Sequence, residues 1–120
     1  MAWKLDSSKP IYIQLIEVLE TRIVSGEYQP GQKVPSVREL AGEAGVNPNT
    51  MQKALVELEN KGMIVTNRTS GRYVTENREI LDSVKESNVD EFVKEFIKGM
   101  IALGFTKSEI KDIVSNHLEK

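Results

Sequence analysis

Apolar residues recur at helical spacing in three stretches of the first half of the chain. The first stretch begins after Pro10 and stops at Ser25-Gly26, where the chain turns polar. The second runs from Pro35 to Gly45 and the third from Pro48 to Gly62. Their apolar positions are Ile11, Tyr12, Leu15, Ile16, Leu19 and Ile23, then Val37, Leu40, Ala41 and Ala44, then Met51, Ala54, Leu55 and Leu58. The pattern predicts three amphipathic helices.

The ends of the second and third predicted helices carry strong local signals. Ser36 and Glu39 have the S-x-x-E spacing of a capping box, and Gly45 suits the left-handed residue that ends a helix. Asn47 suits an N-cap, and Pro48 suits the first helical position, where no N–H is needed. Two short amphipathic helices joined by a three-residue turn containing glycine are typical of a helix-turn-helix.

The hydrophobic period changes after Gly62. The stretch "MIVTNRTSGRYVT" predicts two β-strands around a Thr-Ser-Gly tip, with Arg68 and Arg72 beside the loop. A short third strand is expected at 32–34. A helix-turn-helix followed by a basic hairpin is the winged-helix arrangement, so the fold class is α+β, mainly α, over a first domain at residues 1–75.

From Glu76 onward the pattern is helical again and predicts a second segment, residues 76–120, of one long and one short helix. Thr106 and Glu109 repeat the capping-box spacing at the start of the short helix. Two such helices cannot cover both of their apolar faces alone, and exposed apolar stripes mark interfaces. We therefore expect this tail to form a homodimer. Its expected interface consists of Val89, Phe92, Val93, Phe96, Ile97, Met100, Ile110, Ile113 and Val114.

Composition narrows the class of protein without naming a function. The 120 residues carry a net charge of −2 and no cysteine, which excludes disulfides and thiolate metal sites. Residues 1–75 hold 9 basic and 8 acidic side chains, net +1, whereas residues 76–120 hold 7 and 10, net −3. No signal peptide or membrane-length apolar run is present, so a cytoplasmic protein is expected.

The start of the third helix carries the candidate chemistry. With Met51 on the buried side, Asn49, Gln52 and Lys53 lie on the sides and back of that helix. Asn and Gln side chains can pair with adenine in the major groove, and Thr50 can donate to a phosphate or contact a thymine methyl.

Basic residues add phosphate contacts around this helix. Arg38 lies in the first turn of the second helix, where a cation opposes the helix dipole and a bound anion would explain it. Arg68 and Arg72 extend the charge onto the hairpin, and Gly71 permits close approach of the backbone. Each residue alone is also an ordinary surface residue; their location along one edge favours duplex DNA as the partner.

Other chemistries lack the residues that they need. His117 is the single histidine, with no acidic set around it, and is expected to be a surface residue rather than a metal ligand. There is no phosphate-binding glycine loop and no catalytic set, so neither an enzyme nor a cofactor is expected. The sequence pattern identifies no small-molecule effector. The alternative function is a winged helix that contacts only other proteins.

The stretch "KPIYIQLIEVLETRIVSGEYQPGQKVPSVRELAGEAGVNPNTMQKALVELENKGMIVTNRTSGRYV" resembles the DNA-binding domain of the GntR family of bacterial transcription regulators. With its short two-helix tail the chain looks like the YtrA subfamily. The resemblance implies a winged-helix regulator of the repressor type that binds an inverted-repeat operator as a homodimer. The DNA contacts that it implies are Ser36, Arg38, Asn47, Asn49, Thr50, Gln52, Lys53, Arg68, Gly71 and Arg72.

The sequence departs from the family pattern at two positions. Pro48 stands where many members carry an arginine, so a strong guanine contact is not expected there. Thr69 stands where the wing commonly has the first glycine of G-x-G.

Overall fold

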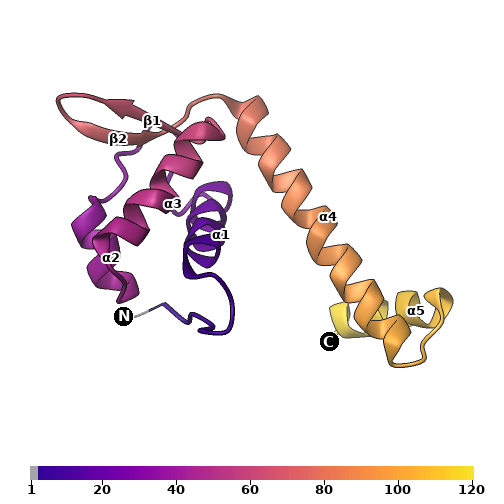
Figure 1. Ribbon diagram of the computed structural model, residues 1–120. Coiled ribbons are helices and arrows are strands. Elements are labelled where there is room, and N and C mark those ends of the chain that lie inside the picture. The colour runs from indigo at the N-terminus through magenta and orange to yellow at the C-terminus, as the bar shows by residue number, and fades with distance from the viewer. Residues whose placement is uncertain (1–2) are drawn as a thin grey trace. The chain divides into compact units, whose positions relative to one another are not determined.

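The computed structural model describes residues 3–120, which form five helices and one two-stranded sheet (Figure 1). The predicted mainly helical α+β class is confirmed. The elements in chain order are α1 (Ile11–Val24), α2 (Val37–Ala44), α3 (Pro48–Asn60), β1 (Ile64–Asn67), β2 (Gly71–Val74), α4 (Arg78–Ala102) and α5 (Lys107–Leu118).

The three predicted amphipathic stripes meet in one hydrophobic core. Helix α3 packs against both α1 and α2, and the side chains of Leu19, Leu40 and Leu55 are fully buried. The strands close one end of this core through Ile64 and Val74, which are 3% and 2% exposed. The hydrophobic period in the sequence therefore identified the buried face of each helix.

The hairpin has the predicted antiparallel pairing, from Ile64 opposite Val74 to Asn67 opposite Gly71. The third strand expected at 32–34 is reduced to a single bridge between Lys33 and Tyr73. Two backbone bonds flank this bridge, since Val34 N–H donates to Arg72 and Val74 N–H donates to Gln32. The pairing stops there because the next residue is proline, which has no N–H to continue a ladder.

The chain divides into two compact units, the first ending at Val84 and the second covering Lys85–Lys120. The first unit continues past the boundary expected at residue 75, because the first turns of α4 pack on the hydrophobic core. Leu81 is only 6% exposed, and Ile80 and Val84 are half-buried against the same cluster.

The second unit contains the rest of α4 and all of α5. The capping box predicted at the start of α5 is present: Thr106 Oγ1 accepts from Glu109 N–H, and Glu109 Oε1 accepts from Thr106 N–H. Within residues 3–120, no helix is long and apolar enough to cross a membrane.

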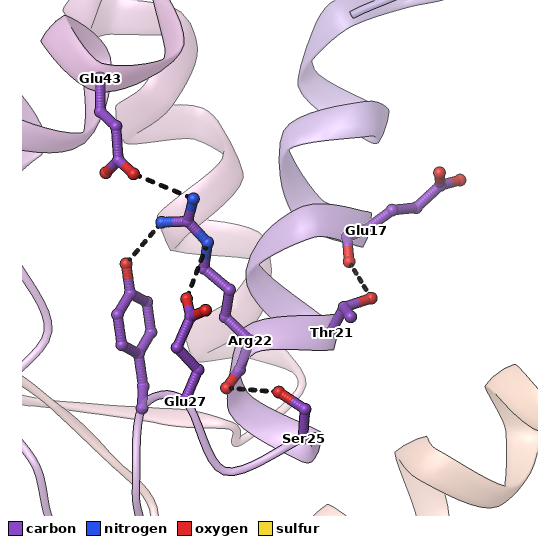
Figure 2. A network of polar contacts seen from close by, with 7 residues as sticks. Glu17, Thr21, Arg22, Ser25, Glu27 and Glu43 are labelled. Atoms are coloured by element: carbon purple, nitrogen blue, oxygen red, sulfur yellow. Dashed lines mark hydrogen bonds and ion pairs between the residues drawn. The ribbon is translucent and has the colours of Figure 1, made fainter. Parts of the chain in front are cut away.

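A polar cluster around Arg22 ties the end of α1 to α2 (Figure 2). The Arg22 guanidinium pairs with Glu43 of α2 at 3.0 Å and with Glu27 of the following loop at 3.1 Å, and it donates to the Tyr28 hydroxyl at 2.8 Å. The indole ring of Trp3 lies on the same guanidinium, 4.7 Å from ring centroid to Cζ. Arg22 thus links the end of α1 to α2 through Glu43.

The pair between Arg22 and Glu43 predicts a pH-dependent stability. Its hydrogen bond to Arg22 lowers the pKa of Glu43 below the ordinary 4.5. The pair therefore stabilises the fold above that pH, and its contribution is lost as the pH falls through the folded-state pKa. We expect Glu43→Gln to lower the free energy of unfolding by about 0.5–1 kcal/mol at pH 7, as for a partly exposed pair.

Urea unfolding at pH 7 and at pH 3 measures this effect, and the difference from wild type should shrink at the lower pH. Glu17→Gln is the matched control, because the Glu17 carboxylate points away from Arg22 in Figure 2. Equal destabilisation by the two variants would rule out the pair as a stabilising contact.

Candidate nucleic-acid interface

The turn between α2 and α3 is built by local side-chain and backbone bonds. Ser36 Oγ accepts from Glu39 N–H at 3.1 Å, and Glu39 Oε1 accepts from Ser36 N–H at 3.2 Å, which completes the predicted capping box. Gly45 adopts φ 74°, as its predicted left-handed role requires, and its N–H donates to Ala41. The chain can then reverse at once into α3, which begins at Pro48 after the N-cap Asn47.

The N-terminus of α3 has the orientation that the sequence predicts. Met51 is fully buried, while Asn49 and Gln52 are exposed on the outer side of the helix and Thr50 is half-buried. Asn47 Oδ1 accepts from Asn49 N–H at 2.8 Å, so this oxygen is used by the cap and its amide NH₂ remains for another partner. The side chains expected to read bases therefore lie at a helix start whose first turn is capped by Asn47.

Lys53 also lies in an exposed position but leans toward α1. Its ammonium is 5.3 Å from the centroid of the Tyr12 ring, within the range of a cation–π contact. Of the residues expected at α3, it is the one already engaged by another helix.

Arg38 is exposed in the first turn of α2, beside the capping box. Among the side chains of residues 3–120 it has no ion-pair partner, whereas Arg22 pairs with Glu27 and Glu43, and Arg72 pairs with Glu59. An unneutralised arginine at a helix start is suited to binding an anion such as a phosphate.

The tip of the hairpin, residues 68–70, is closed by Asn67. Its Oδ1 accepts from the Thr69 N–H at 3.0 Å and from the Thr69 hydroxyl at 2.8 Å. This local bonding stabilises the tip without a glycine at position 69, and Gly71 supplies the single positive φ of the hairpin, 116°. Arg68 is exposed at this tip.

Arg72 differs from the other expected contacts. Its Nε lies 2.6 Å from Glu59 Oε1 near the end of α3, and both side chains are largely covered, at 20% and 29% exposure. Hydrogen bonding to Arg72 lowers the pKa of Glu59, which keeps the carboxylate charged. The pair fastens the hairpin to α3, so Arg72 has a structural partner that the sequence did not indicate.

The expected DNA contacts therefore divide by exposure. Eight are exposed: Ser36, Arg38, Asn47, Asn49, Gln52, Lys53, Arg68 and Gly71. Thr50 and Arg72 are half-buried.

Two charged residues near this surface, Glu59 and Lys33, are not among the contacts expected from the sequence. Glu59 lies near the end of α3, and only the folded hairpin brings Arg72 to it. The side chain of Lys33 lies across Gly71: its Cε is 3.2 Å from the position that a Cβ would take there. For Lys33, the available signal was the short strand expected at 32–34, which would place this residue alongside the hairpin.

The apolar positions expected at a dimer interface lie in the second unit. Val89, Phe92, Val93 and Phe96 are exposed on α4, at 50%, 73%, 48% and 45%. Ile97 and Met100 on α4, and Ile113 and Val114 on α5, are half-buried. Ile110 is 6% exposed within the single chain and leaves little surface for a partner.

No group of three acidic, histidine or cysteine side chains within residues 3–120 is arranged to hold a metal ion. The exposed His117 lies on α5, where its Nδ1 is 2.9 Å from the Ile113 carbonyl of the preceding turn.

A helix-turn-helix with outward amides and arginines, joined to a basic hairpin, defines a winged-helix DNA-binding domain. The family model described as "Bacterial regulatory proteins, gntR family" matches residues 11–74. The chain therefore belongs to the gntR family of bacterial transcription regulators, as its resemblance predicted, and it is not an enzyme.

Two relatives match over most of the chain. The uncharacterized HTH-type transcriptional regulator YhcF of Bacillus subtilis is 40% identical over 116 residues, 97% of this chain and 96% of that protein. The HTH-type transcriptional repressor YtrA of the same organism is 44% identical over 92 residues, 76% and 71% of the two chains. The predicted resemblance to YtrA is thus confirmed.

Solved structures agree with the fold. A GntR family transcriptional regulator from Listeria monocytogenes superposes with a TM-score of 0.86 at 39% identity, over 93% of this chain and 98% of that one. The DNA-binding domain of AraR in complex with operator ORX1 has a TM-score of 0.54 at 29% identity, over 62% of this chain and 92% of that one. A relative of the same fold is thus seen bound to operator DNA.

The bond between Glu59 and Arg72 predicts how firmly the hairpin is held. We expect Glu59→Gln to speed amide exchange in β1 and β2 about fivefold, because a charge-assisted bond of this kind contributes about 1 kcal/mol. Hydrogen exchange followed by NMR measures this, with the α1 amides as an internal reference. Glu57→Gln, an exposed neighbour, should leave the hairpin unchanged, and equal exchange in both variants would contradict a fastening role.

Proposed function

We propose that this regulator is a repressor that binds an inverted-repeat operator as a homodimer. The observation that carries the proposal is the exposed edge formed by Arg38, Asn49, Gln52 and Arg68 on a rigid helix-turn-helix and hairpin. Phosphate contacts from the arginines would set the register, and the amides would read base edges in the major groove.

Dimerisation is supported by the chemistry of the second unit. Phe92 is 73% exposed and Phe96 45% exposed, one helical turn apart on α4, with Val89 and Val93 beside them. Leaving two aromatic rings in water is unfavourable, since burying one such side chain is worth about 1.5–3 kcal/mol. A second copy offers the same apolar face and completes it by two-fold symmetry.

Two-fold symmetry determines the expected operator. A symmetric dimer presents two identical α3 helices, so its site has half-sites in inverted orientation, about one DNA turn or 34 Å apart. Repression is supported by relatives named as repressors, YtrA and NagR of Bacillus subtilis. Residues 1–75 are the proposed winged-helix DNA-binding domain, and residues 76–120 are the proposed dimerisation segment.

A winged helix that contacts only proteins is the rival function. A surface that contacts only proteins does not require unpaired cations beside exposed amides. In this chain Arg38 and Arg68 lie along the same edge as the exposed amide of Asn49. The relative in complex with its operator also favours DNA.

Selection of duplexes from a random-sequence library with the full chain provides the operator for testing this proposal. We expect Arg38→Ala to weaken binding to selected and scrambled duplexes alike. Loss of one phosphate contact per half-site should also make the dependence of log affinity on log salt shallower by about 0.9 per contact. Fluorescence anisotropy over a salt series measures both effects, and an unchanged slope would exclude Arg38 as a phosphate contact.

Asn49→Ala is the contrasting variant, because an amide that reads a base changes preference rather than charge. We expect it to reduce the ratio of selected to scrambled affinity by about 5- to 150-fold per half-site, the range for one bidentate base contact, with the salt slope unchanged. A preserved ratio would remove Asn49 from the base-reading set.

Phe92→Glu tests the dimer, because a carboxylate at the centre of the apolar face cannot be buried without a partner charge. We expect wild type to sediment as a dimer and the variant as a folded monomer, with weaker operator binding through the loss of a tethered second half-site. Val65→Glu, at a 56% exposed site on β1, is the matched control and should remain dimeric. A dimeric Phe92→Glu protein would place the interface elsewhere.

A further inference from the structure

The segment 32–34, which lies along β2, carries the cation Lys33, and Lys33 takes part in neither the Arg22–Glu43 pair nor the Arg72–Glu59 pair. Lys33 forms the bridge with Tyr73, and backbone bonds on both sides fix its segment along β2: Val34 N–H to Arg72 O at 2.8 Å and Val74 N–H to Gln32 O at 2.9 Å. Lys33 is therefore positioned as firmly as a strand residue, although its segment is too short to be one.

Register decides which side of the hairpin Lys33 occupies. Side chains alternate across a strand, so residues 64, 66, 72 and 74 share the inner face, where Arg72 meets Glu59. Lys33 pairs with Tyr73, so both lie on the opposite face, and Gly71 is two residues further along that face. The diagonal neighbour of Lys33 is therefore Gly71, at the base of the tip.

The absence of a side chain at Gly71 lets Lys33 cross the strand. Its Cε lies 3.2 Å, and its Nζ 3.9 Å, from where a Cβ at Gly71 would be. The aliphatic stem thus lies over the backbone of Gly71, and Lys33 as a whole is exposed.

The charge of Lys33 is not neutralised by its surroundings. No carboxylate in residues 3–120 comes within 4.0 Å of its Nζ. The carboxylate of Glu76 lies beside Gly31, 2.8 Å from the position that a Cβ would take there. Arg72, by contrast, is paired with Glu59 at 2.6 Å. Of the two cations flanking the base of the hairpin, Lys33 is the one left to bind an anion.

The chain path connects Lys33 to the rest of the proposed interface. Figure 1 shows the segment after residue 31 running from the hairpin directly to α2. Ser36 and Arg38 follow Lys33 by three and five residues along this path. Lys33 therefore fills the interval between the hairpin tip and the start of α2.

We propose that Lys33 is a DNA phosphate contact of the wing, and that Arg72 acts as the positioning residue that holds the hairpin for it. This inference rests on the proposed function, because it assigns a further residue to the same DNA-binding edge. The ligand is the duplex backbone, which Lys33 recognises as a charge and without regard to base sequence.

The test compares Lys33→Gln, Lys33→Arg and Lys9→Gln with wild type, all as full chains, on a duplex selected by the wild-type protein. Lys9→Gln removes the same charge from an exposed position in the loop before α1, which Figure 1 shows away from the hairpin. Thermal unfolding checks that each variant is folded, which is expected because all these side chains are exposed.

We expect Lys33→Gln to make the salt dependence of log affinity shallower by about 1.8 for a dimer, or 0.9 per half-site. Its affinity relative to wild type should change by about tenfold between 50 and 200 mM salt. The ratio of selected to scrambled affinity should not change, and Lys33→Arg should restore the slope.

A slope for Lys33→Gln equal to that of Lys9→Gln would overturn the inference. If Arg38→Ala still weakened binding in that case, only the role of Lys33 would fail. If wild type itself failed to bind any duplex, the proposed function would fail with it.

Discussion

Burial of one face of α3 is the constraint on which the rest of this protein depends. Met51, Ala54, Leu55 and Leu58 are each fully buried between α1 and α2. Removing any of the large members from water contributes about 1.5–3 kcal/mol, far more than a surface polar contact. The helix therefore cannot rotate, and the side chains on its other face are directed outward without needing bonds of their own.

The polar contacts of the first unit refine this arrangement at its margins. Arg22 joins α1 to α2 through Glu43, and Arg72 joins the hairpin to α3 through Glu59. Both pairs lie partly exposed, so each is worth little compared with the core. Their effect is geometric: they fix the angle of α2 and of the wing, on which the spacing between Arg38 and Arg68 depends.

Much of the fold was predictable because its signals are local. The capping boxes at Ser36 and Thr106, and the N-cap at Asn47, act within three residues, so spacing alone identified the helix starts. The orientation of Asn49 and Gln52 followed from the same helical period. The strand expected at 32–34 was wrong because strand length depends on the partner and on Pro35, and composition does not specify a partner.

The sequence by itself determined which faces of the helices are apolar and where the helices begin, because both are set by residues within a turn or two of each other. Tertiary structure alone decided which charges remain available. Glu59 and Arg72 are 13 residues apart and meet only after the hairpin folds back on α3. Lys33 and Gly71 are 38 residues apart in sequence and meet only because the segment around Lys33 pairs with β2. Charge neutralisation depends on such distant pairings, and these are fixed by packing rather than by any local pattern.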